Sequence, residues 1–167
     1  MLRVLGWIAV IGVAALVAFG AWVRLAPSDP AVWHVDPLSE PGTGKPNSFR
    51  LLPEGMGDQP ADAAAPAYPV DAATLAAAFD AHVMAQPRTT RLAGDPGDLW
   101  VTYVQRSLAF GFPDYVSVRF FDLPDGGATL AIYSRARFGT SDLGVNFARV
   151  EDWVAGLQPL ARGDEPG

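Results

Sequence analysis

Residues 99–137 read LWVTYVQRSLAFGFPDYVSVRFFDLPDGGATLAIYSRAR, and this stretch decides the fold. Apolar and polar side chains alternate along it in three runs, as expected for strands that bury one face. The runs are Leu99–Phe110, Tyr115–Phe121 and Ala128–Arg137. Pro124-Asp125-Gly126-Gly127 separates the second run from the third, and its glycines accept the positive φ of a tight turn. Short connections of this kind predict an antiparallel meander.

A helix is expected on each side of the meander. The apolar positions recur three or four residues apart: Leu75, Phe79 and Val83 in the first helix, and Phe147, Val150, Val154 and Leu157 in the second. Asp71 and Asn146 stand where the two N-caps are expected, and Pro87 ends the first helix. Two amphipathic helices packed on one face of an antiparallel sheet predict an α+β fold.

The N-terminal segment is apolar enough to cross a membrane. Val4 to Val23 is a run of twenty residues without a charged side chain. A helix of this length covers about 30 Å, the hydrocarbon thickness of a bilayer. Arg3 and Arg24 flank the run, and Trp7 and Trp22 lie near its ends, where indole rings prefer the membrane interface. We therefore expect one N-terminal transmembrane helix ahead of the α+β domain.

A cleaved signal peptide is the alternative for the same segment. Ala18-Phe19-Gly20 has the small-x-small pattern that a signal peptidase accepts, which would leave Ala21 as the first residue. The apolar run continues past this position to Val23, which favours an uncleaved anchor. The absence of Lys and Arg from Leu25 to Gly44 favours a cytoplasmic N-terminus. Both alternatives place the rest of the chain outside the cytoplasm.

The turn-forming residues divide the chain into four predicted regions. These are a transmembrane anchor or signal peptide over residues 1–24, an irregular linker and loop region with short strands over 25–70, an α+β core over 71–160, and a tail over 161–167. Within the second region, Val32–Val35 and Phe49–Leu52 are expected to be short strands. Gly55–Pro69 is rich in Ala, Pro, Asp and Gly, which predicts a long surface loop.

Composition excludes several classes of function. The net charge of −6 gives the molecule no field that would gather polyanions, so we expect no nucleic-acid partner. The chain contains no cysteine, which excludes disulfides, thiolate metal sites and a cysteine nucleophile. Its two histidines, His34 and His82, are too few for a typical His-rich metal centre. We predict neither a metal nor a cofactor.

A set of motifs in chain order resembles a known family. The motifs are Arg106-Ser107, Gly111-Phe112-Pro113-Asp114, Tyr133-Ser134-Arg135-Ala136-Arg137-Phe138-Gly139, Ser141-Asp142-Leu143-Gly144-Val145-Asn146 and Arg149-Val150-Glu151. Together they are similar to the bacterial and plastid family called domain of unknown function 1499 (DUF1499). Pro46-Asn47 resembles the family's upstream Pro-Asn pair, but Ser48 stands where many members carry cysteine. The resemblance implies a compact α+β domain and supplies no catalytic residues.

Polar residues of the matched stretch are candidates for a ligand site. The candidates are Arg106, Asp114, Arg135, Arg137, Ser141, Asp142 and Asn146. Strand alternation puts Arg135 and Arg137 on one face, and Asp142 follows closely enough to fold back towards either guanidinium. Guanidinium forks beside a helix N-terminus are suited to a carboxylate or a phosphate. The structural alternative is that Arg–Asp pairs simply tie a strand to the loop that enters the helix.

Three large apolar side chains crowd one strand end and the loop after it. These are Leu108, Phe110 and Phe112. An exposed cluster at this place is expected to contact a partner or lipid. The alternative is ordinary packing in the core.

Two hypotheses of function follow from these patterns. The first is a non-catalytic domain tethered to the bacterial inner membrane and facing the periplasm, which binds an envelope protein or a small anionic or lipid-like ligand. The second is an enzyme that uses Asp114 or Asp142 as general base, with arginines stabilising negative charge. Binding predicts a pocket lined by arginine and no perturbed carboxylate. Catalysis predicts an enclosed Asp with a raised pKa beside open space.

Overall fold

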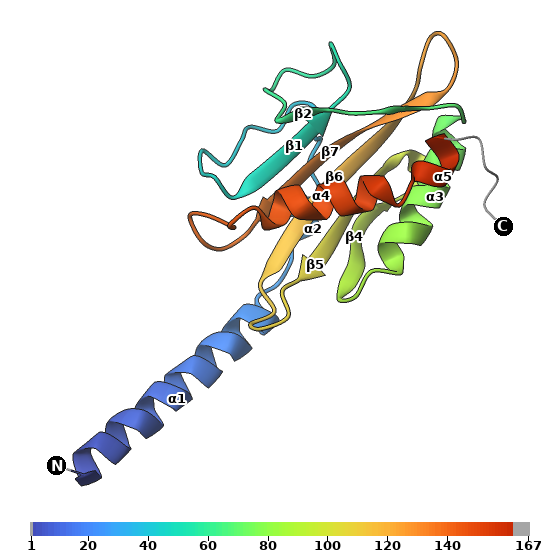
Figure 1. Ribbon diagram of the computed structural model, residues 1–167. Helices are drawn as coiled ribbons and strands as arrows, with labels where there is room; N and C mark the ends of the chain where they lie inside the picture. Colours follow the sequence, from blue (N-terminus) through green and yellow to red (C-terminus); the bar gives the residue numbers. More distant parts are fainter. Residues whose placement is uncertain (1, 162–167) are drawn as a thin grey trace.

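The computed structural model of the chain describes residues 2–161, and within them seven strands form one mainly antiparallel sheet (Figure 1). The strands are β1 (Ser48–Leu52), β2 (Ala63–Ala64), β3 (Ala67–Tyr68), β4 (Thr89–Asp95), β5 (Trp100–Arg106), β6 (Pro113–Asp122) and β7 (Ala128–Ala136). Their order across the sheet is β2-β1-β7-β6-β5-β4, with β3 also paired to β7. The predicted tail lies outside the described residues except for Ala161.

The predicted meander is confirmed as β5, β6 and β7. The turn before β7 also has the expected form, because Gly126 and Gly127 have φ of +91° and +82°. The first run is shorter than expected. β5 ends at Arg106, where the Ser107 amide donates to the Phe112 carbonyl at 2.9 Å and closes a loop. The sequence reasoning missed β4, which extends the meander by one strand.

The region before residue 71 contributes to the same sheet. The strand expected at Phe49–Leu52 is confirmed as β1, which pairs antiparallel with β7. Gly55–Pro69 was expected to be a surface loop, but it contains β2 and β3, and Tyr68 is buried. The alanines of β2 pair with β1, and Ala67 and Tyr68 of β3 pair with β7. Composition alone does not reveal these pairings.

Two helices cover one face of the sheet, as predicted (Figure 1). They are α3 (Ala72–Met84) and α4 (Val145–Ala155), and the short α5 (Gln158–Ala161) follows. The Asp71 carboxylate caps α3 by accepting from the Thr74 amide at 2.6 Å. Phe79 and Trp153 pack from the two helices against Tyr103 of β5, with ring centroids 6.0–6.1 Å apart. The α+β fold class is therefore correct.

The opposite face of the sheet is covered by the segment that precedes β1. This segment contains α2 (Pro30–Trp33), so the strand expected at Val32–Val35 is wrong. Pro30 occupies the first turn, and the Asp29 carboxylate accepts from the Ala31 amide at 2.9 Å, which favours a helical start. The Trp33 ring stacks on Tyr115 of β6 at 3.9 Å. Both faces of the central sheet are thus covered.

The N-terminal helix α1 (Leu2–Leu25) projects from this body (Figure 1). Its stretch Arg3–Leu25 contains an 18-residue window with a mean hydropathy of 2.4 and is long and apolar enough to cross a membrane, a property that signal sequences share. Most of its side chains are exposed, but Val23 near its end is fully buried. The rings of Trp22 and Phe138 lie 5.6 Å apart, so the end of α1 packs against the body.

Candidate functional site

The seven predicted site residues do not converge on one place. Successive residues of β7 point to opposite faces of the sheet, so Arg135 lies away from α4 while Ser134 lies beneath it. Asp114 and Asn146 belong to the helix-covered face. Arg106, Arg135 and Arg137 lie on the other face, and Arg106 donates to the Gly111 carbonyl at 3.0 Å. Ser141 and Asp142 lie in the loop before α4. The predicted set is therefore two clusters, one on each face.

The cluster under α4 is a closed polar network around Arg149. Its Nη2 donates to Asp114 Oδ2 at 2.6 Å in a buried ion pair. Its Nη1 donates to Asn146 Oδ1 at 2.5 Å and Ser134 Oγ at 3.1 Å, and its Nε donates to Gln105 Oε1 at 2.6 Å. These contacts tie α4 to β5, β6 and β7. The sequence reasoning left Arg149 out of the site, although its spacing of three from Asn146 puts both on one helix face.

Gly144, rather than Asn146, occupies the N-cap position of α4, and the Asp142 carboxylate supplies an acceptor for its first amides. The helix begins at Val145 after Gly144, and the Asp142 carboxylate accepts from the amides of Gly144 at 3.1 Å and Asn146 at 2.7 Å. Asn146 lies inside the helix and is fully buried, with its side-chain amide donating to the Asn47 carbonyl at 3.0 Å. The N-cap expected at Asn146 is therefore wrong. The reason is that Asp142 reaches the first free amides from outside the helix.

The expected pairing of Asp142 with an arginine of β7 is also wrong. Burial tends to raise the pKa of Asp142, but the hydrogen bonds from Asn146 and Gly144 outweigh it and hold the pKa below its usual value. Arg135 instead donates to the Trp33 carbonyl at 2.8 Å, and Arg137 donates to the Pro27 carbonyl at 2.9 Å. The two arginines share a face, as strand alternation predicts, but that face looks towards the N-terminal segment.

A small hollow lies beside the Asp114 end of the buried network. Its volume is about 280 Å³, and its lining includes Asp114, Ser141, Asp142 and Phe138. Burial raises the pKa of Asp114, while the adjacent Arg149 guanidinium opposes that rise. An enclosed aspartate with a raised pKa beside open space is the arrangement that the catalytic hypothesis requires.

The other face carries two buried guanidinium groups beside one tyrosine ring. Arg50 of β1 and Arg135 of β7 are 3% and 4% exposed, and their Cζ atoms lie 4.1 Å and 5.0 Å from the centroid of Tyr133. Burial lowers the pKa of Arg135 to about 10, so this group keeps its charge at neutral pH in a poorly solvated place. Within residues 2–161, neither guanidinium has a carboxylate oxygen within 4 Å.

Arg50 has a buried donor group without a partner in the described part of the chain. Its Nη2 donates to the Glu40 carbonyl at 2.6 Å, and its backbone amide donates to Asp62 Oδ2 at 2.7 Å. Its Nη1 and the hydroxyl of Tyr133 are both buried, and among the described residues neither has a hydrogen-bond partner. Buried polar groups are satisfied in the great majority of cases, so this adjacent pair requires an explanation.

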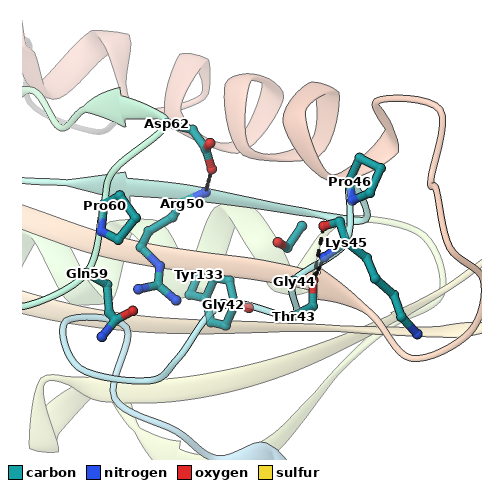
Figure 2. Close-up of a pocket in the computed structure, with 11 residues that line it drawn as sticks. Gly42, Thr43, Gly44, Lys45, Pro46, Arg50, Gln59, Pro60, Asp62 and Tyr133 are labelled. Atoms are coloured by element: carbon teal, nitrogen blue, oxygen red, sulfur yellow. Dashed lines mark hydrogen bonds between the residues drawn. The ribbon is translucent and has the colours of Figure 1, made fainter.

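Two adjoining hollows share Tyr133, and Figure 2 shows the residues that line the first of them. The first, of about 310 Å³, lies between the loop Gly42–Lys45, residues 59–62 and the pair Arg50 and Tyr133. The second, of about 410 Å³, shares Tyr133 and part of the same loop. It adds the side chains of Trp33, Arg135 and Arg137. In Figure 2 the Arg50 guanidinium lies between Gln59 and the Tyr133 ring, whereas the Lys45 ammonium points away from it.

This arrangement, called the arginine site below (Arg50, Tyr133, Arg135, Arg137 and the loop Gly42–Lys45), is suited to an anion. Guanidinium forks bind carboxylate and phosphate oxygens in a fixed geometry. Across the described part of the chain, no group of three or more His, Asp or Glu side chains could hold a metal ion. Arg50 and Tyr133 were absent from the sequence prediction because nothing local reveals that β1 pairs with β7, which places these two residues opposite each other.

Comparison with known proteins identifies a family. Residues 40–157 match the family model described as protein of unknown function, DUF1499. The match spans both clusters and all seven strands, but not α1. No curated protein matches the chain.

Proposed function

The chain belongs to the DUF1499 family, and we propose that it is a membrane-tethered domain outside the cytoplasm that binds a small anionic ligand at the arginine site. The ligand carries a phosphate or carboxylate group, because these groups match the planar donor fork of arginine. On this proposal the domain binds the ligand and does not transform it.

The unpartnered Nη1 of Arg50 carries the proposal. A buried donor without an acceptor costs about 1–3 kcal/mol, and more when the group is charged. An anion bound at the arginine site would offer acceptor oxygens to these two unpartnered groups, Arg50 Nη1 and the Tyr133 hydroxyl. It would also supply negative charge to Arg135, whose hydrogen bonds go to neutral oxygens of Trp33 and Ser117. One anion thus compensates for three features of the site that are otherwise unfavourable.

Binding of inorganic phosphate to the full chain tests this proposal. We expect phosphate to raise the melting temperature of the detergent-solubilised protein more than chloride does at equal ionic strength, since a ligand that binds only the folded state stabilises it by mass action. Arg50→Gln should abolish this rise. Arg119→Gln is the matched control, because Arg119 lies on the same sheet face but is already paired with Asp36 at 2.5 Å.

Native mass spectrometry of the same three proteins, extracted gently from their own membranes, extends the test to a ligand retained from the cell. A discrete adduct on the wild type and on Arg119→Gln, but not on Arg50→Gln, would support the proposal and give a mass to identify. Equal phosphate responses in all three proteins, or no response beyond that of chloride together with a bare polypeptide mass, would overturn it.

The tether is supported by α1. The helix is long and apolar enough to cross a bilayer, and Arg3 and Arg24 flank its apolar run. The orientation with the body outside the cytoplasm is supported by the absence of Lys and Arg from residues 25 to 44. In a bacterium this corresponds to the inner membrane and the periplasm. Secretion after cleavage of a signal peptide is the alternative.

Proton transfer by Asp114 is the second candidate function. It is favoured by the raised pKa of this buried carboxyl group and by the hollow of about 280 Å³ beside it. Asp114 would act as general base with Arg149 beside it to stabilise charge. A reaction found in family members and lost in Asp114→Asn, with folding retained, would establish this function. The same reaction persisting in Asp114→Asn would exclude it.

A further inference from the structure

A loop of the body lies against the C-terminal end of α1, which is the end nearest the sheet (Figure 1). This loop, residues 107–112, connects β5 to β6. The ring of Phe112 lies 6.1 Å from that of Phe19 on α1, and the ring of Phe110 lies 5.5 Å from that of Phe112. The loop thus continues an apolar surface that begins on α1.

Internal hydrogen bonds hold this loop in place. The Gly111 amide donates to the Ser107 carbonyl at 3.1 Å, and the Phe112 amide donates to Ser107 Oγ at 3.0 Å. Gly111 has a φ of +73°, and Arg24 of α1 packs close to it. Even so, Leu108 is 77% exposed and Phe110 is 40% exposed. An ordered loop that presents large apolar side chains to the outside indicates a binding surface.

A crevice of about 630 Å³ separates α1 from this loop. Leu16, Val17 and Gly20 line it from α1, and Ala109 and Phe110 line it from the loop, so its walls are apolar. Arg24, near the C-terminal end of α1, also lines it. At 1.5 Å per residue, Gly20 is about 6 Å and Leu16 about 12 Å below Arg24 along the helix. If Arg24 lies at the level of the lipid headgroups, the crevice lies among the acyl chains.

We propose that this crevice holds an acyl chain of a phospholipid from the bilayer that α1 spans, with the lipid phosphate beside Arg24 and the side chains of Leu108 and Phe110 inserted in the same leaflet. The inference rests on the tether proposed above but is independent of the arginine site. The occupant is lipid because hydrocarbon is the medium that surrounds Leu16 and Val17 in a spanning helix. The net negative charge of the chain is repelled by an anionic membrane surface. The contact between the loop and the bilayer is therefore made by apolar side chains.

The absence of cysteine makes a direct test of depth feasible, because one introduced cysteine is labelled uniquely. An environment-sensitive fluorophore is attached in turn to Leu108→Cys, Asp125→Cys and Val13→Cys in the full chain, reconstituted in phosphatidylcholine nanodiscs with or without bromine on the acyl chains. We expect brominated lipid to quench the labels at positions 108 and 13. The label at 125, in the turn at the far end of the sheet (Figure 1), should remain unquenched.

The three positions separate the two proposals. Quenching at 13 without quenching at 108 would overturn the lipid contact and leave the tether intact. No quenching at 13 would overturn the tether itself, and with it the lipid contact.

A larger side chain that fills the crevice tests whether a phospholipid occupies it. A Cβ at Gly20 or at Gly12 meets no atom within 4 Å, so both positions accept a larger side chain, but only Gly20 lines the crevice. Native mass spectrometry from the nanodiscs should show a retained phospholipid on the wild type and on Gly12→Leu, and at least a fivefold smaller fraction on Gly20→Leu. Equal retention in all three proteins would overturn the inference. A dimer mass lost only in Gly20→Leu would also overturn it, because a second copy would then be the occupant.

Discussion

Asp142 shows how one carboxylate determines where a helix starts. It lies outside α4 yet accepts from the Gly144 and Asn146 amides, which are free at the first turn. A negative group at this end also interacts favourably with the helix dipole. The loop from Gly139 to Gly144 is thereby fixed against α4 by a charged group rather than by a buried apolar contact.

We expect Asp142→Ala to lower the free energy of unfolding by about 1 kcal/mol at pH 7. Because the folded-state pKa of Asp142 is depressed, this contribution is present above the unfolded pKa of about 3.8 and is lost as the pH falls through the folded value. Urea unfolding at pH 7 and at the lowest pH that keeps the protein folded measures the difference. A deficit that stays constant across this range would contradict a charge-dependent cap.

Urea unfolding also tests whether the polar clusters on the two faces of the sheet contribute independently to stability. Asp142 and Arg135 share no hydrogen-bond partner, so the losses in Asp142→Ala and Arg135→Ala should add in the double mutant to within about 0.5 kcal/mol. A larger coupling would mean that the two residues act in one network.

The contact of α4 with the sheet depends on a buried ion pair. Arg149 and Asp114 have side-chain exposures of 6% and 12%, and each leaves an uncompensated charge when the other is removed. We expect Arg149→Met or Asp114→Leu alone to cost about 3–5 kcal/mol, and the double mutant to cost less than the sum. Chemical denaturation of the three variants measures the coupling.

The less buried pair Arg91 and Asp80 supplies the control for this cycle. Its side chains are 34% and 16% exposed and its N–O distance is 2.8 Å. Breaking a pair near the surface should cost about 1 kcal/mol or less. Similar costs for the two pairs would show that burial around Arg149 adds nothing.

The fold was predictable where apolar side chains recur at the regular spacing of a strand or a helix. Alternation over residues 99–137 gave the meander, and the apolar residues around Phe79 gave α3, because these patterns reflect burial of one face. β4 was missed because Gly94 and the exposed Arg91 weaken its alternation. The strand expected around Trp33 failed because Asp29 and Pro30 start a helix turn before β-propensity can act.

The site was less predictable because it depends on contacts between distant segments. Arg135 and Arg137 were placed on one face by alternation, but the covering segment that surrounds them lies about a hundred residues earlier in the chain. Arg50 could be recognised only after β1 was known to pair with β7. Arg149 was named in the motifs but not chosen as a site residue, because the buried face of α4 is partly polar, whereas the predicted stripe included Phe147, which is 51% exposed.

At the scale of the whole molecule, the main question is whether α1 remains attached. We expect intact-mass analysis of membrane-extracted protein to find residues 1–20 present, since the apolar run continues to Val23 beyond the candidate cleavage position. A mature species that begins at Ala21 would show that the segment is a signal peptide. Urea-washed membranes provide the control, because a peripheral protein is released from them and a spanning one is not.

The junction between α1 and the body leaves almost no free linker. Ala26 still donates to the Trp22 carbonyl, and the next residue, Pro27, already accepts from Arg137 of the body. With α1 in a bilayer, the arginine site would therefore stand at a fixed height and orientation above the membrane. Encounters with a membrane-bound partner would then depend on lateral diffusion in two dimensions, and a ligand released by such a partner would need to travel only a short distance along the surface.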